Sequence, residues 1–429
     1  MTQPSMPSGI ASELLPVPVR VATLDNGLTV GLVTNRQAPI VTTALWYRAG
    51  SRDEAAGQGG AAHFLEHMMF KGSGKYGAGE IDRRTQELGG SNNAFTSHDG
   101  TAYYFNFARD RWQEALAIEA DRMAGLALAE DEVASERQVI LEEIAMYEDD
   151  PWDALGRQVE WAMFPRHPYG LPVLGSREEL LAMGREELAA FHRAYYRPDN
   201  AVLVLAGDLP EDALEAVEES FGHLAAGAKK RRATDPAIAL ERRYEVERRH
   251  GEVERLLVAF RSPAAGHPDH PPLRLLATVL ASGRASRLQR ALVDEGQLCS
   301  AVQVDLGETL DPGHFQISAE VVPGRSIEQV EAVLFEQLDA VISATGVSDE
   351  ELERARRMVR SDWVFSHERV HQQALAAGFE LALFERGFLE RQVAALLAAD
   401  ATRLRQVAGR YLDPSGGCVV GRSRAAEAA

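Results

Sequence analysis

The sequence predicts an α+β protein with two homologous domains, each a mainly antiparallel sheet packed with helices, joined by a linker. The chain has 429 residues, more than a single compact core usually contains. Strand-like and helical runs follow one another in the first half, and the second half repeats their order. A segment rich in Ala, Gly, Thr and Pro separates the halves. We therefore expect an N-terminal domain at 17–224, a linker at 225–237 and a C-terminal domain at 238–422.

The composition argues against several classes of partner. The net charge of −19 disfavours nucleic acid and an anionic membrane surface. The sequence contains neither 18 consecutive apolar residues nor an opening segment of the secretory type. The two cysteines, Cys299 and Cys418, lack metal-type spacing and are most simply small core residues. These features lead us to expect a cytoplasmic protein that binds neither membrane nor nucleic acid.

The first half is predicted to contain both strands and helices. Residues 19–34 are a predicted hairpin around Asn26-Gly27, a pair that suits a type I′ turn with positive φ, and residues 40–47 are a further strand. After a glycine-rich turn at 57–60, the segments around 61–70 and 80–88 are predicted helices. Two strands joined by a turn at Asp99-Gly100 occupy residues 91–107. The remaining elements are helices at 111–126, 131–147, 152–163, 187–195 and 211–221, and a buried strand within 196–208.

The segment Asn93-Ala94-Phe95-Thr96 is small and polar for a core strand. This composition is typical of an edge strand, which could pair with an incoming peptide by β-addition. A plain exposed edge explains the segment equally well when it is considered alone.

The second half echoes the first. Residues 256–262 resemble 43–51, and the predicted helix at 273–280 takes the place of 63–70. Residues 348–361 match 130–143, with Arg354 in place of Glu136 and Ser361 in place of Glu143, and residues 411–421 resemble 195–207. The halves therefore look like two copies of one unit, and in this comparison the first copy alone carries metal-type groups.

The segment His63-Phe64-Leu65-Glu66-His67 predicts a metal site. Residues four apart lie on one face of a helix, so both imidazoles can approach one ion. Histidine nitrogen suits zinc, and a catalytic zinc usually has three protein ligands. Glu66 is close enough to act as a general base on a water at the fourth position. Glu143, on a partly apolar helix, is the candidate third ligand, although a helical glutamate is usually just a solvated group.

A second motif competes with this site. His367-Glu368-Arg369-Val370-His371 is a literal H-E-x-x-H, and Glu380 or Glu385 could supply a third ligand. Its charged Arg369 and polar neighbours instead favour an exposed helix face.

Several segments together carry a family resemblance. They are Ala49-Gly-Ser-Arg-Asp-Glu54, the stretch 60–72 around the two histidines, Gly90-Ser-Asn-Asn-Ala-Phe-Thr96, Glu136-Arg-Gln-Val-Ile-Leu-Glu-Glu143 and residues 195–207. With them the chain resembles the pitrilysin/insulinase superfamily of inverted-motif zinc peptidases, in the short form similar to a mitochondrial processing peptidase subunit.

This resemblance implies roles for individual residues. His63, His67 and Glu143 would bind one zinc ion per chain, and Glu66 would activate water. Glu136 would be a supporting catalytic carboxylate near the site. The residues that would pair with the substrate backbone are Asn93, Ala94, Phe95 and Thr96.

One departure from the family concerns a partner. Active assemblies of this family use an Arg and a Tyr from a second half or subunit, whereas Val293 and Ser300 occupy those places here. The resemblance therefore implies a zinc metalloendopeptidase subunit that hydrolyses extended or unfolded peptides in an enclosed chamber. Its partner would be a homologous zinc-less subunit carrying the Arg/Tyr pair, so that the two form a heterodimer. The alternative is a non-catalytic scaffold or assembly subunit of the same family.

Overall fold

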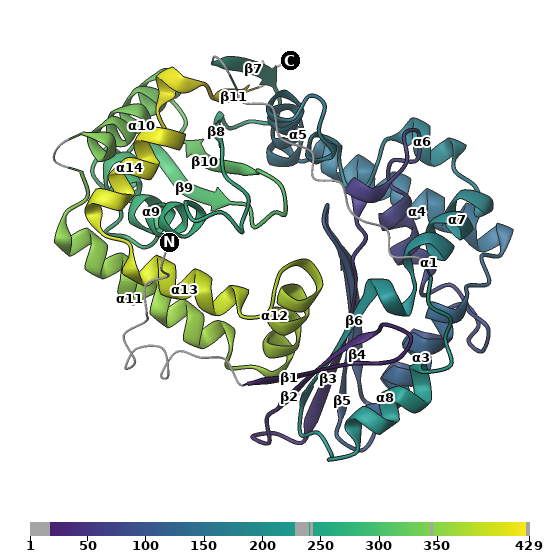
Figure 1. Cartoon of the computed structure of the whole chain (residues 1–429). Helices are drawn as coiled ribbons and strands as arrows, with labels where there is room; N and C mark the ends of the chain where they lie inside the picture. The colour runs from purple at the N-terminus through teal and green to yellow at the C-terminus, as the bar shows by residue number, and fades with distance from the viewer. Residues whose placement is uncertain (1–17, 228–239, 241–242, 344–345, 426–429) are drawn as a thin grey trace.

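The computed structural model describes residues 18–227, 240, 243–343 and 346–425. They form two domains, each a β-sheet packed with helices, as the sequence predicts (Figure 1). Most of the predicted linker, residues 228–237, lies outside the described residues, and the domain limits stay a prediction. Within the described residues no helix is both long and apolar enough to cross a membrane.

The first sheet has six strands in the order β1-β2-β6-β3-β5-β4. Its neighbouring strands are antiparallel except for β2 and β6, which are parallel. Thus the predicted mainly antiparallel sheet is confirmed. Its strands are β1 (Val19–Thr23), β2 (Thr29–Thr34), β3 (Ile40–Tyr47), β4 (Ser91–Thr96), β5 (Thr101–Ala108) and β6 (Ala201–Gly207).

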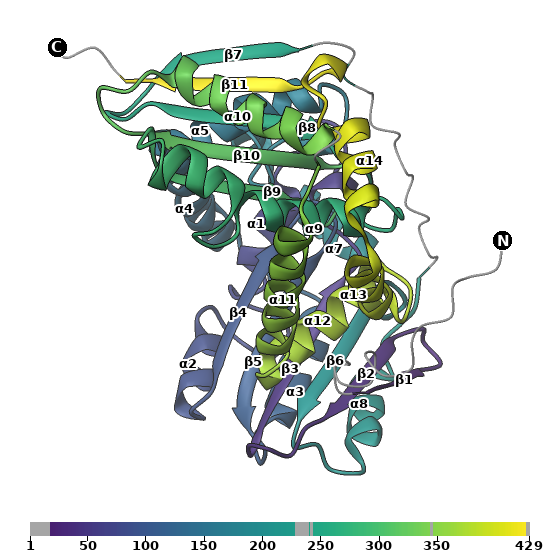
Figure 2. The same ribbon diagram turned by 90° about the vertical axis from the view of Figure 1, so that its left-hand side faces the viewer.

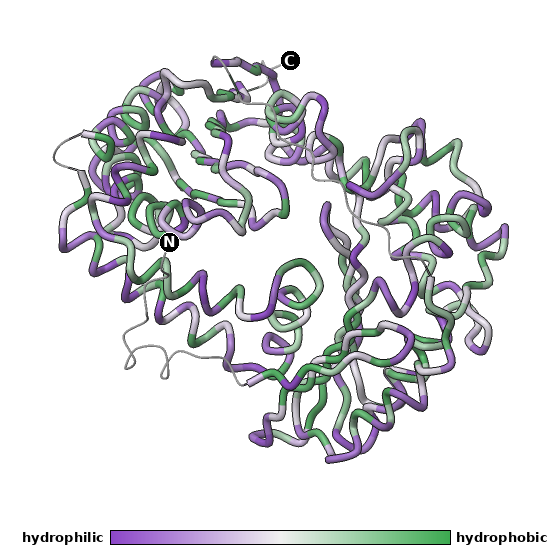
Figure 3. Tube along the Cα trace, in the orientation of Figure 1, coloured by the Kyte–Doolittle hydropathy of each residue, from purple (hydrophilic) through white to green (hydrophobic). Residues whose placement is uncertain are grey.

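Both faces of the first sheet are covered. Successive side chains of a strand point to opposite faces, so Leu203 and Leu205 of β6 lie in one core while Val202 and Val204 lie in another. The first core contains α1 (Ala61–Met68), α3 (Gln113–Ala124), α7 (Arg185–Tyr195) and α8 (Ala213–Phe221). The second core is closed by α12 (Val370–Leu383). Figure 3 shows the central strands of this sheet as mostly hydrophobic.

The second sheet has five strands in the order β7-β11-β8-β10-β9. One face packs against the helices of its own half, and the other receives Leu155 and Val159 of α5 (Pro151–Met163) from the first half. Its strands are β7 (Tyr244–Arg249), β8 (Arg255–Arg261), β9 (Cys299–Leu306), β10 (His314–Val321) and β11 (Val419–Arg424). Its helices are α9 (His270–Ala281), α10 (Ile327–Ile342), α11 (Asp349–Ser366), α13 (Phe388–Ala398) and α14 (Ala401–Tyr411).

The two halves exchange helices. Helix α5 comes from the first half but packs on the second sheet, and α12 comes from the second half but packs on the first sheet (Figures 1 and 2). Helix α5 follows α4 (Glu130–Asp149), and α12 follows α11. The sequence comparison matches α4 with α11, so the exchanged helices occupy equivalent places in the two halves. The exchange buries apolar surface from both halves against each other, and it thereby fixes the two domains relative to one another.

Several local predictions need small corrections. The hairpin of β1 and β2 is present, but only Gly27 of the Asn26-Gly27 pair has a positive φ, so the loop is not a type I′ turn. Helix α2 (Glu80–Glu87) agrees with its prediction to one residue, whereas α6 (Arg177–Ala182) was not predicted. Cys299 and Cys418 are buried free thiols, as expected.

Candidate metal centre and active site

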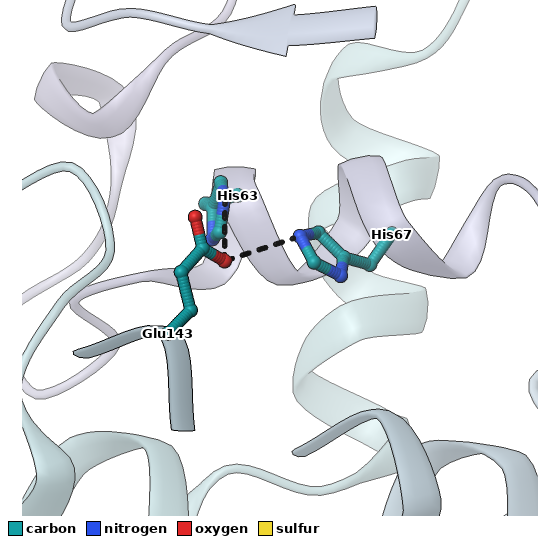
Figure 4. Close-up of side chains that lie close together, drawn as sticks. All are labelled: His63, His67 and Glu143. Atoms are coloured by element: carbon teal, nitrogen blue, oxygen red, sulfur yellow. Dashed lines mark ion pairs between the residues drawn. The ribbon is translucent and has the colours of Figure 1, made fainter. Parts of the chain in front are cut away.

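Helix α1 presents the two histidines of the inverted motif. Phe64, Leu65 and Met68 point into the core, which turns His63 and His67 toward helix α4. Figure 4 shows both imidazoles facing the carboxylate of Glu143, which α4 supplies. The predicted arrangement of two helical histidines and a glutamate from a later helix is therefore present in the structure.

A half-buried carboxyl group fixes the beginning of α1. Glu54 accepts hydrogen bonds from the backbone N–H groups of Gly60 at 3.0 Å and Ala62 at 2.9 Å. These are the unpaired donors at a helix N-terminus, where a negative charge is also favoured by the helix dipole. Burial raises the pKa of Glu54 to about 8, against the opposing effect of the two N–H groups. Glu54 thus fixes residues 60–62, the first turn of α1, which directly precede His63.

The three candidate ligands fit a tetrahedral zinc ion. Glu143 Oε2 lies 3.7 Å from His63 Nε2 and 3.7 Å from His67 Nε2. Ligands bonded to zinc at roughly 2.0–2.1 Å in a tetrahedron are about 3.3 Å apart, so small side-chain movements suffice for binding. Within the described part of the chain, these three residues form the one group of at least three His, Cys, Asp or Glu side chains suited to a metal ion.

Each of the two histidines can offer a ring nitrogen to a metal ion. Burial, with a contribution from His67, lowers the pKa of His63 to about 3, so its imidazole is neutral at physiological pH. The Nδ1 atom of His67 lies 2.9 Å from Glu136 Oε1 and donates to that carboxylate, which leaves the Nε2 lone pair free for a metal.

Glu136 is held in turn by Lys71, whose Nζ lies 2.6 Å from Glu136 Oε2. Burial alone would raise the pKa of Glu136, but the hydrogen bonds from Lys71 and His67 outweigh it and lower the pKa. The carboxylate is therefore ionised and can fix the orientation of the His67 ring. The expected position of Glu136 near the site agrees with this geometry.

Glu66 lies on α1 between the metal centre and the edge of the first sheet. Thr96 Oγ1 donates a hydrogen bond of 2.5 Å to Glu66 Oε2. Burial raises the pKa of Glu66, while the hydrogen bond from Thr96 lowers it. A carboxyl group with a raised pKa beside a metal centre has the properties of a general base.

The strand that carries Thr96 is the outer strand of its sheet. Among the described strands, β4 pairs only with β5, which agrees with the predicted edge strand. Its residues are alternately exposed and half-buried, and Phe95 packs edge-on against Trp46. The N–H of Ala94 donates to Asn93 Oδ1 at 2.8 Å, so an incoming peptide strand would compete with this bond.

The H-E-x-x-H motif does not build a second metal site. His367 directly follows helix α11 and His371 belongs to α12, so the two are not on one helix. His367 Nδ1 lies 2.9 Å from the carbonyl of Trp363, and the His371 ring packs on Tyr104 with 4.6 Å between centroids. The expected exposed helix face is also wrong, because both histidines are partly buried where α12 meets the first sheet.

The second half has the same pair of packed helices as the metal centre but lacks the matching metal-binding side chains. Arg354, at the place of Glu136, donates to the carbonyls of Ser282 and Val279 at the end of α9. Helix α9 is the counterpart of α1, so the same two helices meet in both halves. An arginine that binds a helix C-terminus replaces the carboxylate that orients a histidine.

Sequence reasoning missed two residues of the site. Glu54 and Lys71 lie within segments that carry the family resemblance, but the sequence predicts no role for either. Glu54 could have been found as an acidic residue just before a glycine-rich helix start. Lys71 carries no comparable signal, because its ion pair joins the segment after α1 to helix α4, which is far away in sequence.

Two family models match consecutive parts of the chain. Residues 29–177 match "Insulinase (Peptidase family M16)", and residues 182–359 match "Peptidase M16 inactive domain". An uncharacterised zinc protease of Mycobacterium leprae is 34% identical over 351 residues, which cover 79% of this chain and 76% of the relative. The uncharacterised zinc protease YmxG of Bacillus subtilis is 29% identical over 390 residues, covering 90% of this chain and 94% of the relative.

Solved structures show the same architecture. A protease from Helicobacter pylori superposes with a TM-score of 0.89 at 26% identity, covering 95% of this chain and 99% of that chain. A structure from Pseudomonas fluorescens described as a peptidase M16 inactive domain has a TM-score of 0.83 at 20% identity, covering 96% and 98% of the two chains, and it supports the fold. From these matches and the duplicated fold, the chain belongs to the M16 (insulinase) family of peptidases.

Proposed function

We propose that this chain is a zinc-dependent endopeptidase subunit that hydrolyses extended or unfolded peptides. The observation that carries the proposal is the contact between Glu66 and Thr96, beside the ligand group His63, His67 and Glu143. This contact joins a general base to the free edge strand of the sheet, where a substrate backbone would lie. The zinc protease names of the relatives support the same reaction class.

The chain's own residues supply the proton transfers and the substrate alignment. Zinc bound by His63, His67 and Glu143 would polarise the scissile carbonyl and acidify a water molecule. Glu66 accepts the proton of that water and passes it to the leaving amine. Glu136 keeps the ring of His67 in the ligating orientation. A substrate strand that adds to β4, alongside Asn93, Ala94, Phe95 and Thr96, would be extended.

A cavity lined in part by α4, the helix that carries Glu143, offers room for substrate side chains. Its volume is about 620 Å³, and it lies between helices α4 and α5 and the second sheet. Its lining residues include Ile144 and Tyr147, which follow Glu143 on α4, and Gln316 and Ser318 of β10. A peptide on β4 could therefore contact both domains, which suits an unfolded segment better than a folded surface.

The places of the expected Arg/Tyr pair argue for a partner. Val293 is partly buried against the second core, and Ser300 on β9 donates to Glu320 Oε1 at 2.8 Å. Neither side chain can supply a guanidinium or a phenol to a substrate carbonyl. We propose that a homologous zinc-less subunit with this pair forms a heterodimer with the chain, that the two enclose a chamber, and that the complex is cytoplasmic.

The test combines metal content with peptide cleavage. Zinc should be near-stoichiometric in the wild-type chain and in His371→Ala, and it should be lost in His67→Ala. Cleavage of an unstructured fluorogenic peptide should require the partner chain and should disappear in Glu66→Gln, which keeps its zinc. No bound zinc in the wild-type chain, or zinc without cleavage in any pairing with zinc-less homologues, would instead support the scaffold role.

A further inference from the structure

A buried polar cluster joins the two domains close to the proposed active site. We call it the interdomain clasp. Its members are Arg52, Asp99, His167, Tyr169 and Asp311. The side chains of Arg52, Asp99 and Asp311 are 5%, 6% and 2% exposed, so their charges are removed from water and depend on one another.

Arg52 holds the two carboxylates of the clasp together. Its guanidinium donates to Asp99 Oδ1 at 2.7 Å and to Asp311 Oδ2 at 2.5 Å. Asp99 belongs to the turn after β4, and Asp311 belongs to the loop between β9 and β10 of the second domain. A single side chain thus spans the boundary between the domains.

Tyr169 and the loop backbone complete the connection. The Tyr169 hydroxyl donates to Asp99 at 2.8 Å and accepts from the N–H of Asp311 at 3.1 Å. The N–H of Leu310 donates to Asp99 Oδ2 at 2.9 Å. His167 Nδ1 accepts from the N–H of Tyr169, so its Nε2 carries the proton that it donates to Asp311 at 3.1 Å.

The interdomain clasp is directly connected to β4, the strand whose Thr96 is hydrogen-bonded to Glu66. Asp99 lies in the turn 97–100, and Thr96, the residue just before this turn, donates to Glu66. Within the first domain, the N–H groups of Ser51 and Arg52 donate to the carbonyls of Ser97 and His98 at 3.2 and 3.1 Å. The side chain of Asp99, in contrast, accepts a hydrogen bond from the backbone N–H of Leu310 in the second domain.

We propose that Asp311 is a positioning residue for catalysis: through Arg52, Tyr169 and Asp99, the second domain holds the β4–β5 turn so that Thr96 stays against Glu66. The domain whose family model is named inactive then contributes to the active site of its own chain. A displacement of a catalytic group by about 1 Å can cost on the order of a hundredfold in rate, so a modest loosening of the turn would be measurable.

The inference rests on the proposed function, and two readouts separate them. The variants are Asp311→Asn, which keeps the shape of the side chain, and Tyr169→Phe, which removes one hydroxyl. Gln373→Leu is the matched control, because Gln373 accepts from Asn35 at 3.2 Å in another buried interdomain contact, made by α12. Melting temperatures confirm that each full-length, zinc-loaded variant is folded.

Hydrogen exchange of residues 91–100 is the first readout and needs no activity. We expect at least about tenfold faster exchange there in Asp311→Asn and Tyr169→Phe, and no change in Gln373→Leu. Unchanged exchange in both clasp variants would show that the first domain holds the turn alone, and it would overturn the inference. If the wild-type chain cleaves no peptide in any pairing, the proposed function fails, and this readout still decides whether the second domain holds the turn.

Peptide cleavage is the second readout. We expect kcat to fall about tenfold in Asp311→Asn with KM within about twofold of the wild type. If the effect passes through Thr96, adding Asp311→Asn to Thr96→Val should lower kcat little further, because coupled residues are not additive. Fully additive losses, or a kcat unchanged in Asp311→Asn, would contradict the positioning role.

Discussion

The hydroxyl group of Thr96 donates a hydrogen bond of 2.5 Å to Glu66 Oε2. This bond connects the edge of the first sheet to α1, the helix that carries the two candidate histidine ligands. The unpaired backbone groups of an edge strand can pair with another chain, and here the edge strand also contacts the proposed base. One carboxylate oxygen of Glu66 is occupied by Thr96. This contact therefore fixes the carboxylate orientation before any substrate arrives.

Replacing Thr96 by valine should test this connection. Valine keeps the β-branched shape but cannot donate, so the carboxylate of Glu66 loses its fixed orientation. We expect kcat/KM for an unstructured peptide to fall about tenfold, with zinc content unchanged, since Thr96 contacts no ligand. Thr96→Ser keeps the hydroxyl and should retain most activity. Equal losses in the valine and serine variants would point to packing as the cause.

The Lys71–Glu136–His67 chain should control zinc affinity. Glu136→Gln removes the charge that holds the Nδ1 proton of His67, and Lys71→Met removes the cation that keeps Glu136 ionised. Groups that orient a ligand in this way typically change metal affinity by about 10–100-fold. Competition with a coloured chelator should show weaker binding in both variants, with a larger effect for Glu136→Gln. Lys75→Met, on the nearby loop, is the control.

The local sequence pattern determined much of the fold in advance. Strand β3 spans the predicted residues because its side chains alternate between two buried faces, and helix α1 is placed by a glycine-rich start and an apolar face. Glu143 could be named as the candidate third ligand because it lies on a partly apolar helix. Periodicity and motif spacing are local properties, and the sequence reveals them directly.

The contacts that complete the site depend on tertiary packing and could not be predicted. Nothing in residues 370–383 indicates that α12 packs on the sheet of the other half, and so the H-E-x-x-H motif could be taken for one exposed helix face. Asp99 and Asp311 are separated by more than 200 positions, and their common partner Arg52 became visible only with the two domains in place. Such ionic contacts have no sequence periodicity that would reveal them.

Breaking the buried pair of Glu119 and Arg122 should strongly destabilise the first domain. Both side chains are fully buried and joined by two hydrogen bonds of 2.6 and 2.7 Å, and Arg122 also lies over the Tyr103 ring at 4.4 Å. Arg122→Met would leave the Glu119 carboxyl group buried without a partner. We expect a loss of about 3–5 kcal/mol in the free energy of unfolding, measured with urea.

Two further variants check the reason for that loss. Arg83→Met removes an exposed helical ion pair and should change the stability by less than about 0.5 kcal/mol. The double variant Glu119→Gln/Arg122→Met removes both charges and should be less destabilised than Arg122→Met alone, because no unpaired charge remains. If the double variant were the less stable of the two, lost packing would explain the effect.

His98 should make the stability of the protein depend on pH. Burial lowers the pKa of His98 to about 4; Asp99 acts in the opposite direction, and His314, His167 and Arg52 contribute to the lowering. In the unfolded chain the group has its ordinary value of about 6.5. Between these values the unfolded state binds more protons than the folded state, so stability decreases as the pH falls from about 6.5 toward about 4.

This pH dependence can be measured by urea unfolding of the metal-free protein at pH 7 and pH 5, which avoids the release of zinc at low pH. We expect the wild-type chain to lose roughly 1–3 kcal/mol between the two values through His98. His98→Gln keeps a polar side chain beside Ser51 but cannot titrate, so its loss should be smaller by this amount. The exposed His223→Gln should behave as the wild type does. An equal loss in His98→Gln and the wild type would assign the pH dependence to other groups, with His63, whose pKa is also lowered by burial, as the next to replace.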